Sequence, residues 1–170
     1  MARLPLISNR EGLNSDQQAV FDWIVESRGR MIRPYEVLLH VPGIARPAAE
    51  LGHQIRYEGG LSDHDRELAI ITAAQAHRCQ FEWDSHVELA RKEGVSEDTI
   101  AAIETGDEDL DLSDAEIVVF VRELCAGSTV SDLTLGAIEA RVGTAGAVEL
   151  SALVGYYTML GFVMNVAGAC

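Results

Sequence analysis

Residues 67–86 of the chain read ELAIITAAQAHRCQFEWDSH, and this stretch decides the fold. A helix-capping serine, Ser62, precedes an apolar run that continues to Ala76, and this pattern predicts a buried helix. The residues from 79 to 92 predict a second helix, which follows after a short connection. Because the connection is short, we expect the two helices to pack antiparallel.

The rest of the chain carries further helix signals and no alternating pattern typical of strands. There is no internal repeat, low-complexity tract or obvious linker, and a length of 170 residues suits one domain. The sequence therefore predicts a single all-α domain over residues 1–170. Outside the central pair, helices are predicted to begin at Ser15, Pro34, Arg46 or Pro47, Ser96, Ser113, Ser131 and Thr144, the last two separated by a break at Gly143.

Composition excludes several classes of protein. The hydrophobic share of 48% excludes global disorder, and the formal net charge of -14 disfavours a nucleic-acid partner. The same charge repels small anions, so an anionic substrate would need a local arginine or lysine. Three widely spaced cysteines form neither a disulfide framework nor a zinc-binding pattern, and the N-terminus shows no signal peptide. We therefore expect a cytoplasmic protein.

The uncharged segment 150–169 is long enough to span a bilayer. However, it contains Ser151, Asn165 and several glycines, and it lacks flanking basic residues. We therefore predict a helix buried in the core or in a subunit interface, with no membrane partner. Because the chain stops at Cys170 within this apolar region, we expect native residues beyond it.

Four residue types that carry chemistry gather in the central stretch. On a helix, Cys79, Glu82 and His86 fall within an arc of about 60°, and Trp83 flanks that arc. Glu67 lies near the start of the preceding helix and could reach the same place. Taken singly, each has an ordinary structural explanation, such as a surface Glu–His pair or a small buried cysteine. The prediction of a functional site depends on the set.

The order of these residues resembles the carboxymuconolactone decarboxylase family and the alkylhydroperoxidase D-like superfamily that contains it. Cys79 follows Glu67 by twelve residues, and His86 follows Cys79 by seven. The phrase FEWDSH is similar to the decarboxylase-side signature, and the flanks RELAIITAA and VELARKEGVSEDTI add to the likeness. The resemblance implies a helical bundle of about eight helices that assembles as a homo-oligomer, a trimer or a hexamer.

In the peroxidase branch of that superfamily, two cysteines in a CxxC motif carry out redox chemistry with a glutamate and a histidine. The resemblance matches Cys79 to the first cysteine, Glu67 to the glutamate and His86 to the histidine. Glu82 occupies the position of the second cysteine, and a carboxylate cannot complete a disulfide cycle. The chain therefore resembles the branch without the CxxC motif. A thiol-dependent peroxidase that uses Cys79 alone, or a catalytically silent family member, stays as an alternative.

The decarboxylase branch implies a carboxy-lyase of aromatic catabolism that needs no metal and no organic cofactor. Its small-molecule substrate would be a carboxylated lactone of the 4-carboxymuconolactone type. We expect His86 to be the general acid, oriented by Glu82 or Glu67, while Trp83 and its apolar neighbours exclude water. Arg78 is the predicted contact to the anionic substrate, with three further candidates: Arg33, Arg46 and Arg56.

Overall fold

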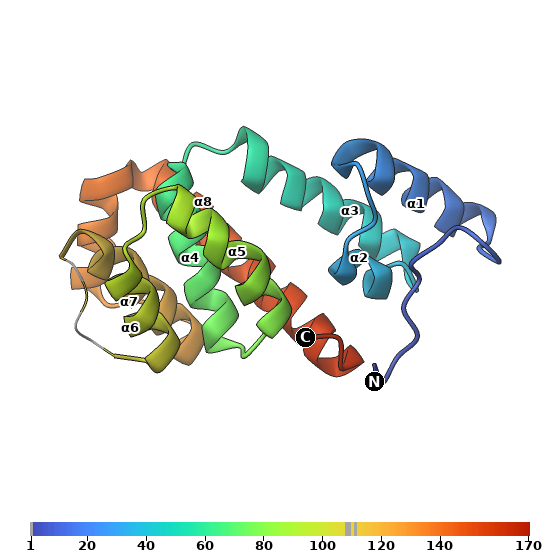
Figure 1. Ribbon diagram of the computed structural model, residues 1–170. Coiled ribbons are helices and arrows are strands. Elements are labelled where there is room, and N and C mark those ends of the chain that lie inside the picture. The colour runs from blue at the N-terminus through green and yellow to red at the C-terminus, as the bar shows by residue number, and fades with distance from the viewer. Residues whose placement is uncertain (1, 108–109, 111) are drawn as a thin grey trace. The chain divides into compact units, whose positions relative to one another are not determined.

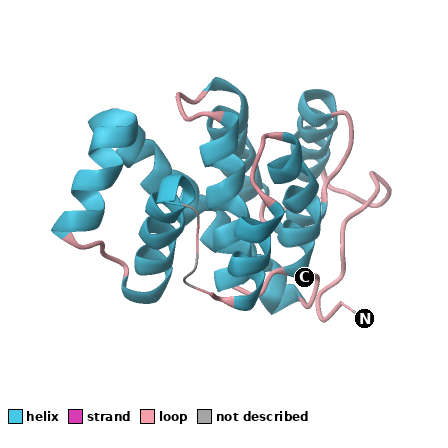
Figure 2. Cartoon of the chain, turned by 60° about the vertical axis from the view of Figure 1, so that its left-hand side comes forward, coloured by secondary structure: helices cyan, strands magenta, loops and turns pink. Residues whose placement is uncertain are grey.

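The computed structural model describes residues 2–107, 110 and 112–170. In this part of the chain all regular structure is helical, which confirms the predicted all-α class (Figure 2). Eight α-helices and one short π-helix are present among the described residues, in agreement with the expected number.

The chain divides into two compact units. The first comprises Met1–Glu58 and Phe162–Cys170, and the second comprises Gly59–Gly161. Each has its own set of buried aliphatic side chains, for example Ile24 and Leu39 in the first unit. The assignment of one functional domain to the whole chain stays a prediction.

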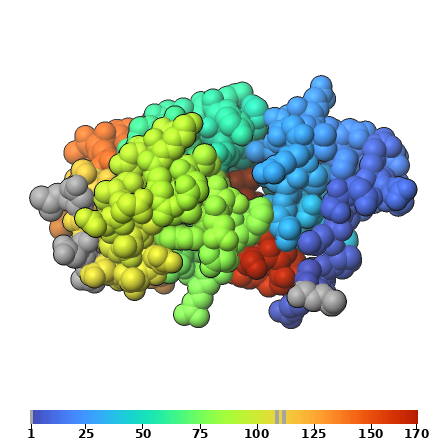
Figure 3. Space-filling view, viewed as in Figure 1, coloured from blue at the N-terminus to red at the C-terminus, as the bar shows by residue number. Residues whose placement is uncertain are grey.

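The first unit is built from the N-terminal helices. Its elements are α1 (Ser15–Arg28), α2 (Arg33–Leu38), α3 (Pro42–His53), the π-helix η1 (Gln54–Glu58) and the last residues of α8. In the space-filling view, the N-terminal residues in dark blue lie on the surface of the lighter blue helices of this unit (Figure 3).

Two helix starts in the first unit differ from the prediction. The cap of α1 is Asn14, whose side chain accepts from the backbone of Gln17 at 2.9 Å, so the capping box lies one residue earlier than expected. The third helix begins at Pro42 rather than at Arg46 or Pro47. Proline suits the first helical position because its missing N–H has no partner there in any case.

The second unit carries the central helix pair. Its elements are α4 (Asp63–Ala76), α5 (Gln80–Lys92), α6 (Glu97–Thr105), α7 (Leu112–Gly127) and most of α8 (Asp132–Ala167). The helix α4 is buried along nearly its whole length and packs against α5, α6 and α7 (Figure 1). The predicted caps at Ser62 and Ser96 are confirmed, since each side-chain oxygen accepts a backbone N–H three residues later.

The long helix α8 is bent at the predicted break. Gly143 has a φ of 72° and a ψ of 172°, a backbone conformation that favours glycine. A Cβ at Gly146 would lie 2.5 Å from the Cβ of Val142, so the turn after the break also needs a glycine. By length and composition α8 could cross a membrane, but half of its apolar stretch is buried within the protein, as in the core helix of a globular domain.

One arginine joins three helices of the second unit. Arg141 of α8 forms a bidentate ion pair with Asp65 of α4, with its Nη2 2.6 Å from Oδ1 and its Nε 3.2 Å from Oδ2. Its Nη1 also donates to the carbonyl of Ser113 in α7. The Asp65 side chain is only 8% exposed, so this pair holds a buried charge as well as three helices.

His64 forms a second link at the start of α4. Its Nε2 lies 2.8 Å from Oδ1 of Asp114 and its Nδ1 lies 3.1 Å from the carbonyl oxygen of Glu93. Both partners accept hydrogen bonds, so the geometry favours the doubly protonated ring. Burial lowers the pKa of His64, but the bonds to Asp114 and Glu93 and the nearby carboxylates outweigh burial and raise it. The charged ring thus joins α4, α5 and α7.

We predict a pH-dependent stability contribution from this link. Because the folded-state pKa of His64 is raised above 6.5, its contribution is fully present below that pH and is lost as the pH rises through the folded value. Urea unfolding of the wild type and of His64→Gln should therefore show a free-energy gap at pH 6 that narrows towards pH 9. The exposed His40, substituted in the same way, provides the control. A gap that stays constant with pH would contradict the assignment.

Candidate active site

The candidate site lies on the facing surfaces of α4 and α5. Glu67 is in the second turn of α4, Cys79 is the N-cap of α5, and Glu82 and His86 follow on consecutive turns of α5. The side chains of Glu67, Glu82 and His86 belong to residues that are only 2%, 4% and 6% exposed. Three ionisable groups are thus buried together, an arrangement that is common at functional sites.

The imidazole of His86 lies between two carboxylates. Its Nδ1 is 2.7 Å from Oε2 of Glu67, and its Nε2 is 3.6 Å from Oε2 of Glu82. A carboxylate accepts hydrogen bonds, so with Glu67 as the acceptor the ring donates from Nδ1. Glu67 therefore fixes the tautomer and the ring orientation, and Nε2 is the nitrogen available for acid–base chemistry. The structure brings these three residues together, and their catalytic roles stay predictions.

Aromatic side chains surround this histidine. The ring of Tyr157, from α8, meets the His86 ring edge to face, with centroids 5.4 Å apart and an angle of 87°. Tyr156 packs in the same manner against Tyr157, at 5.3 Å. Trp83 is 8% exposed and follows Glu82 on α5. Sequence reasoning missed both tyrosines, although the YY pair in the uncharged final helix was a visible signal.

Two other residues predicted for the site, Cys79 and Arg78, lie at the turn between α4 and α5. Cys79 is 1% exposed and stands at the N-terminus of α5. Arg78 is exposed, in the turn between α4 and α5, with a φ of 52°. No ion pair or cation–π contact of Arg78 is found among the described residues to tie it to the buried carboxylates. Its role in binding an anion stays a prediction.

The three other candidate arginines belong to the first unit. Arg33 pairs with Glu36 at 3.3 Å. The guanidinium of Arg46 stacks 4.0 Å from the centroid of the Trp23 ring, and that of Arg56 lies 5.8 Å from the centroid of a tyrosine ring. Each thus has a structural contact within its own unit.

A different arginine, Arg66, lies next to the buried carboxylates. Its side chain is only 12% exposed, and its Nε is 3.9 Å from Oε1 of Glu67. The outer end of the guanidinium donates to the exposed carboxylate of Asp63. Arg66 is not among the residues predicted from the sequence, because helical position alone does not reveal the burial of a long flexible side chain.

The turn between α4 and α5 is held by α8. Nε2 of His77 lies 2.8 Å from Oγ1 of Thr158, and burial lowers the pKa of His77. A Cβ at Gly161 would lie 3.2 Å from the Cβ of His77, so the α8 backbone passes close to this turn. The glycine therefore permits this close approach.

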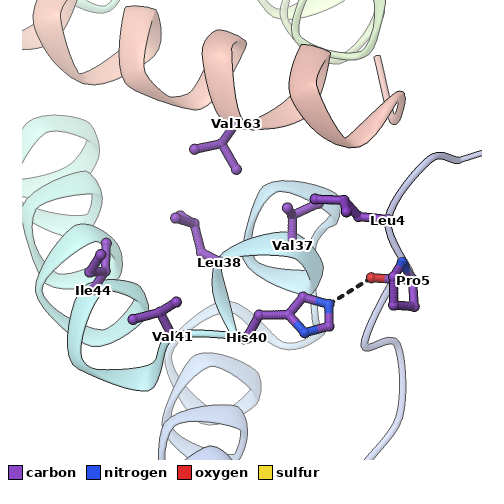
Figure 4. A pocket seen from close by; sticks show the side chains of 8 residues that line it. All are labelled: Leu4, Pro5, Val37, Leu38, His40, Val41, Ile44 and Val163. Carbon is purple, nitrogen blue, oxygen red and sulfur yellow. Dashed lines mark hydrogen bonds between the residues drawn. The ribbon is translucent and has the colours of Figure 1, made fainter.

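Two further features bear on what the protein could bind. Among the described residues, no group of three or more His, Cys, Asp or Glu side chains is arranged to hold a metal ion. The first unit contains a cavity of about 550 Å³ lined by aliphatic side chains, in which His40 bonds to the carbonyl of Pro5 at 2.8 Å (Figure 4). The residues that line this cavity include no carboxylate, so it offers no partner for acid–base chemistry by His40.

Residues 42–120 match the sequence model of the carboxymuconolactone decarboxylase family. The matched segment is just under half of the chain, and over it the sequence is similar to that family. The matched segment contains all four of the residues that form or flank the buried pair of carboxylates, namely Glu67, Cys79, Glu82 and His86.

A solved structure of the same fold extends the likeness to the whole chain. The debrominase Bmp8, solved as a cysteine-to-alanine variant in complex with 2,3,4-tribromopyrrole, superposes with a TM-score of 0.74. The alignment covers 100% of this chain and 93% of that chain at 10% identity, and so shows the fold alone. A search of curated proteins gives no match.

Proposed function

We propose that this protein is a member of the carboxymuconolactone decarboxylase family and a cofactor-independent carboxy-lyase acting on a small carboxylated lactone. The observation that supports this most is the buried hydrogen bond between Nδ1 of His86 and Glu67, with Glu82 beside the second ring nitrogen. A histidine oriented in this way is a general acid or base. The position of Glu82, where a dithiol enzyme would need a cysteine, favours proton transfer over disulfide chemistry.

In the proposed reaction, the C–C bond to the substrate carboxylate breaks and carbon dioxide leaves. The electron pair moves towards the lactone carbonyl and gives a dienolate. The acid form of His86 carries a proton on each nitrogen, of which Glu67 holds one and Nε2 delivers the other to carbon. A proton from water then passes through Glu82 to Nε2 and restores the acid form of His86. The buried aromatic surroundings exclude bulk water and strengthen these electrostatic interactions.

The direct experiment is to incubate the purified protein with 4-carboxymuconolactone in D₂O. We expect release of carbon dioxide and one deuterium at the protonated carbon of the enol-lactone, read by NMR and mass spectrometry. A product with deuterium at random positions, or turnover no faster than in buffer, would contradict the proposal. Further small carboxylated lactones in the same assay define the substrate range.

Thiol-dependent reduction of a peroxide is the second candidate, because Cys79 is the N-cap of α5, the position that matches the first cysteine of the dithiol motif. Cys79→Ser should leave kcat/KM for the lactone unchanged, since the sulfur takes no part in proton transfer. The same variant should lose any peroxide reduction measured with the wild type. Loss of lactone turnover in Cys79→Ser, with unaltered helicity by circular dichroism, would favour the thiol mechanism instead.

A further inference from the structure

The three buried residues Glu67, His86 and Glu82 comprise two acidic side chains and one imidazole. Two carboxylates flank one imidazole, and all three residues are at most 6% exposed. Buried like charges this close repel each other and tend to take up protons unless a cation compensates. Arg66 places one cation next to them, with its Nε 3.9 Å from Oε1 of Glu67.

The placement of Arg66 has no explanation in hydrogen bonding alone. Its side chain is 12% exposed and its buried Nε makes no hydrogen bond, so this polar edge was removed from water without a direct partner. A buried polar atom without a hydrogen bond is rare in proteins and needs an explanation other than packing. Only the outer edge of the guanidinium is paired, with Asp63, which is 61% exposed. The inner edge faces Glu67, and the charge of that carboxylate accounts for its position.

We propose that Arg66 is a positioning residue: its positive charge next to Glu67 sets the pH at which the imidazole of His86 releases the proton on Nε2, while Glu67 holds the Nδ1 end of the ring. The inference rests on the proposed acid–base function for its catalytic consequence, although the charge coupling itself does not require turnover. Glu67 from α4, Glu82 from α5 and Tyr157 from α8 are among the groups that face the histidine. Tyr156 packs against Tyr157.

The sign of the coupling follows from the charges. Removing the positive charge of Arg66 leaves His86 beside two carboxylates with less compensation, so the ring should hold its second proton up to a higher pH. Arg66 lies within 4 Å of the carboxylate that bonds His86. For a charge this near in a protein, we expect the titration midpoint of His86 to rise by about one pH unit in Arg66→Gln. Arg66→Lys keeps the charge and should restore the midpoint.

The experiment follows the imidazole Cε1–H resonance of His86 by NMR from pH 5 to pH 9, with the resonance assigned from its absence in His86→Gln. The control is Arg91→Gln, which removes an equal charge from the exposed end of α5. We expect an upward shift in Arg66→Gln, recovery in Arg66→Lys and no shift in Arg91→Gln. If Arg66→Gln does not fold, Arg66→Met provides a second neutral side chain.

A midpoint in the neutral variants that equals that of Arg91→Gln would overturn the inference. The pH dependence of kcat should move by the same amount in the same direction, whereas a merely structural role would lower kcat at every pH. Failure of the two proposals is distinguishable. A shift of the His86 midpoint without any lactone turnover would support the charge coupling and reject the decarboxylase. Lactone turnover with an unshifted midpoint would support the decarboxylase and reject the charge coupling.

Discussion

Replacing His86 with glutamine should lower kcat/KM for the lactone by about 10² to 10⁴, the range that a positioned general acid supplies. The glutamine amide can still donate to Glu67, in the place of the Nδ1 hydrogen bond of 2.7 Å. It cannot deliver a proton to carbon at neutral pH, because an amide does not titrate in that range. Steady-state kinetics measured by carbon dioxide release would give the size of the loss.

The control for this variant is His40→Gln, which changes an exposed histidine of the first unit. It should retain full activity, and both variants should keep wild-type helicity and thermal stability within a few degrees. If His86→Gln turned over the lactone at the wild-type rate, the acid–base role of this residue would be rejected. The choice of glutamine rather than alanine avoids a cavity beside Glu67 and Tyr157, which could lower activity for a purely structural reason.

Arg141→Met should destabilise the protein by about 3 kcal/mol, because it leaves the Asp65 carboxylate buried without its bidentate partner. In a protein of this size the loss corresponds to a decrease in Tm of about 6 to 12 °C. Thermal unfolding followed by circular dichroism at neutral pH measures it. The Asp65 side chain is 8% exposed and that of Arg141 is 22% exposed, so solvent screens the pair only in part.

The double variant Asp65→Asn/Arg141→Met provides the matched test. Removing the orphaned charge should recover a large part of the loss, since most of the penalty comes from a buried carboxylate without compensation. The single Asp65→Asn variant completes the double-mutant cycle and isolates the pairwise contribution. If the double variant were as unstable as the sum of the two single variants, the pair would have no energetic coupling.

Much of the fold could be predicted because the helix signals are local. Caps at Ser62 and Ser96 and the break at Gly143 depend on interactions within a few residues, and the structure agrees with them. The start of the third helix was misplaced because Pro42 suits both the end of one helix and the first position of the next. The division of the chain into two compact units has no marker such as a linker in the sequence.

The candidate site was predictable in part for the same reason. Spacing on one helix places Glu82 and His86 on one face, and the short connection after α4 favours the approach of Glu67. The contributions of Tyr157 and Arg66 could not be predicted, because they depend on how α8 packs and on the rotamer of a long side chain. The pair of tyrosines is visible in the sequence, but no local pattern shows which buried residue it contacts.

The first two turns of α4 fix the register of the second unit. Four consecutive residues, from 64 to 67, each have a polar side-chain partner, and three of these partners lie on other helices: Asp114 for His64, Arg141 for Asp65 and His86 for Glu67. Inserting or deleting a single residue between these four residues and the rest of α4 would rotate them by about 100° relative to the buried face of the helix and separate the pairs at once. Length variation among relatives should therefore be absent from this segment and be accommodated in the loops on either side.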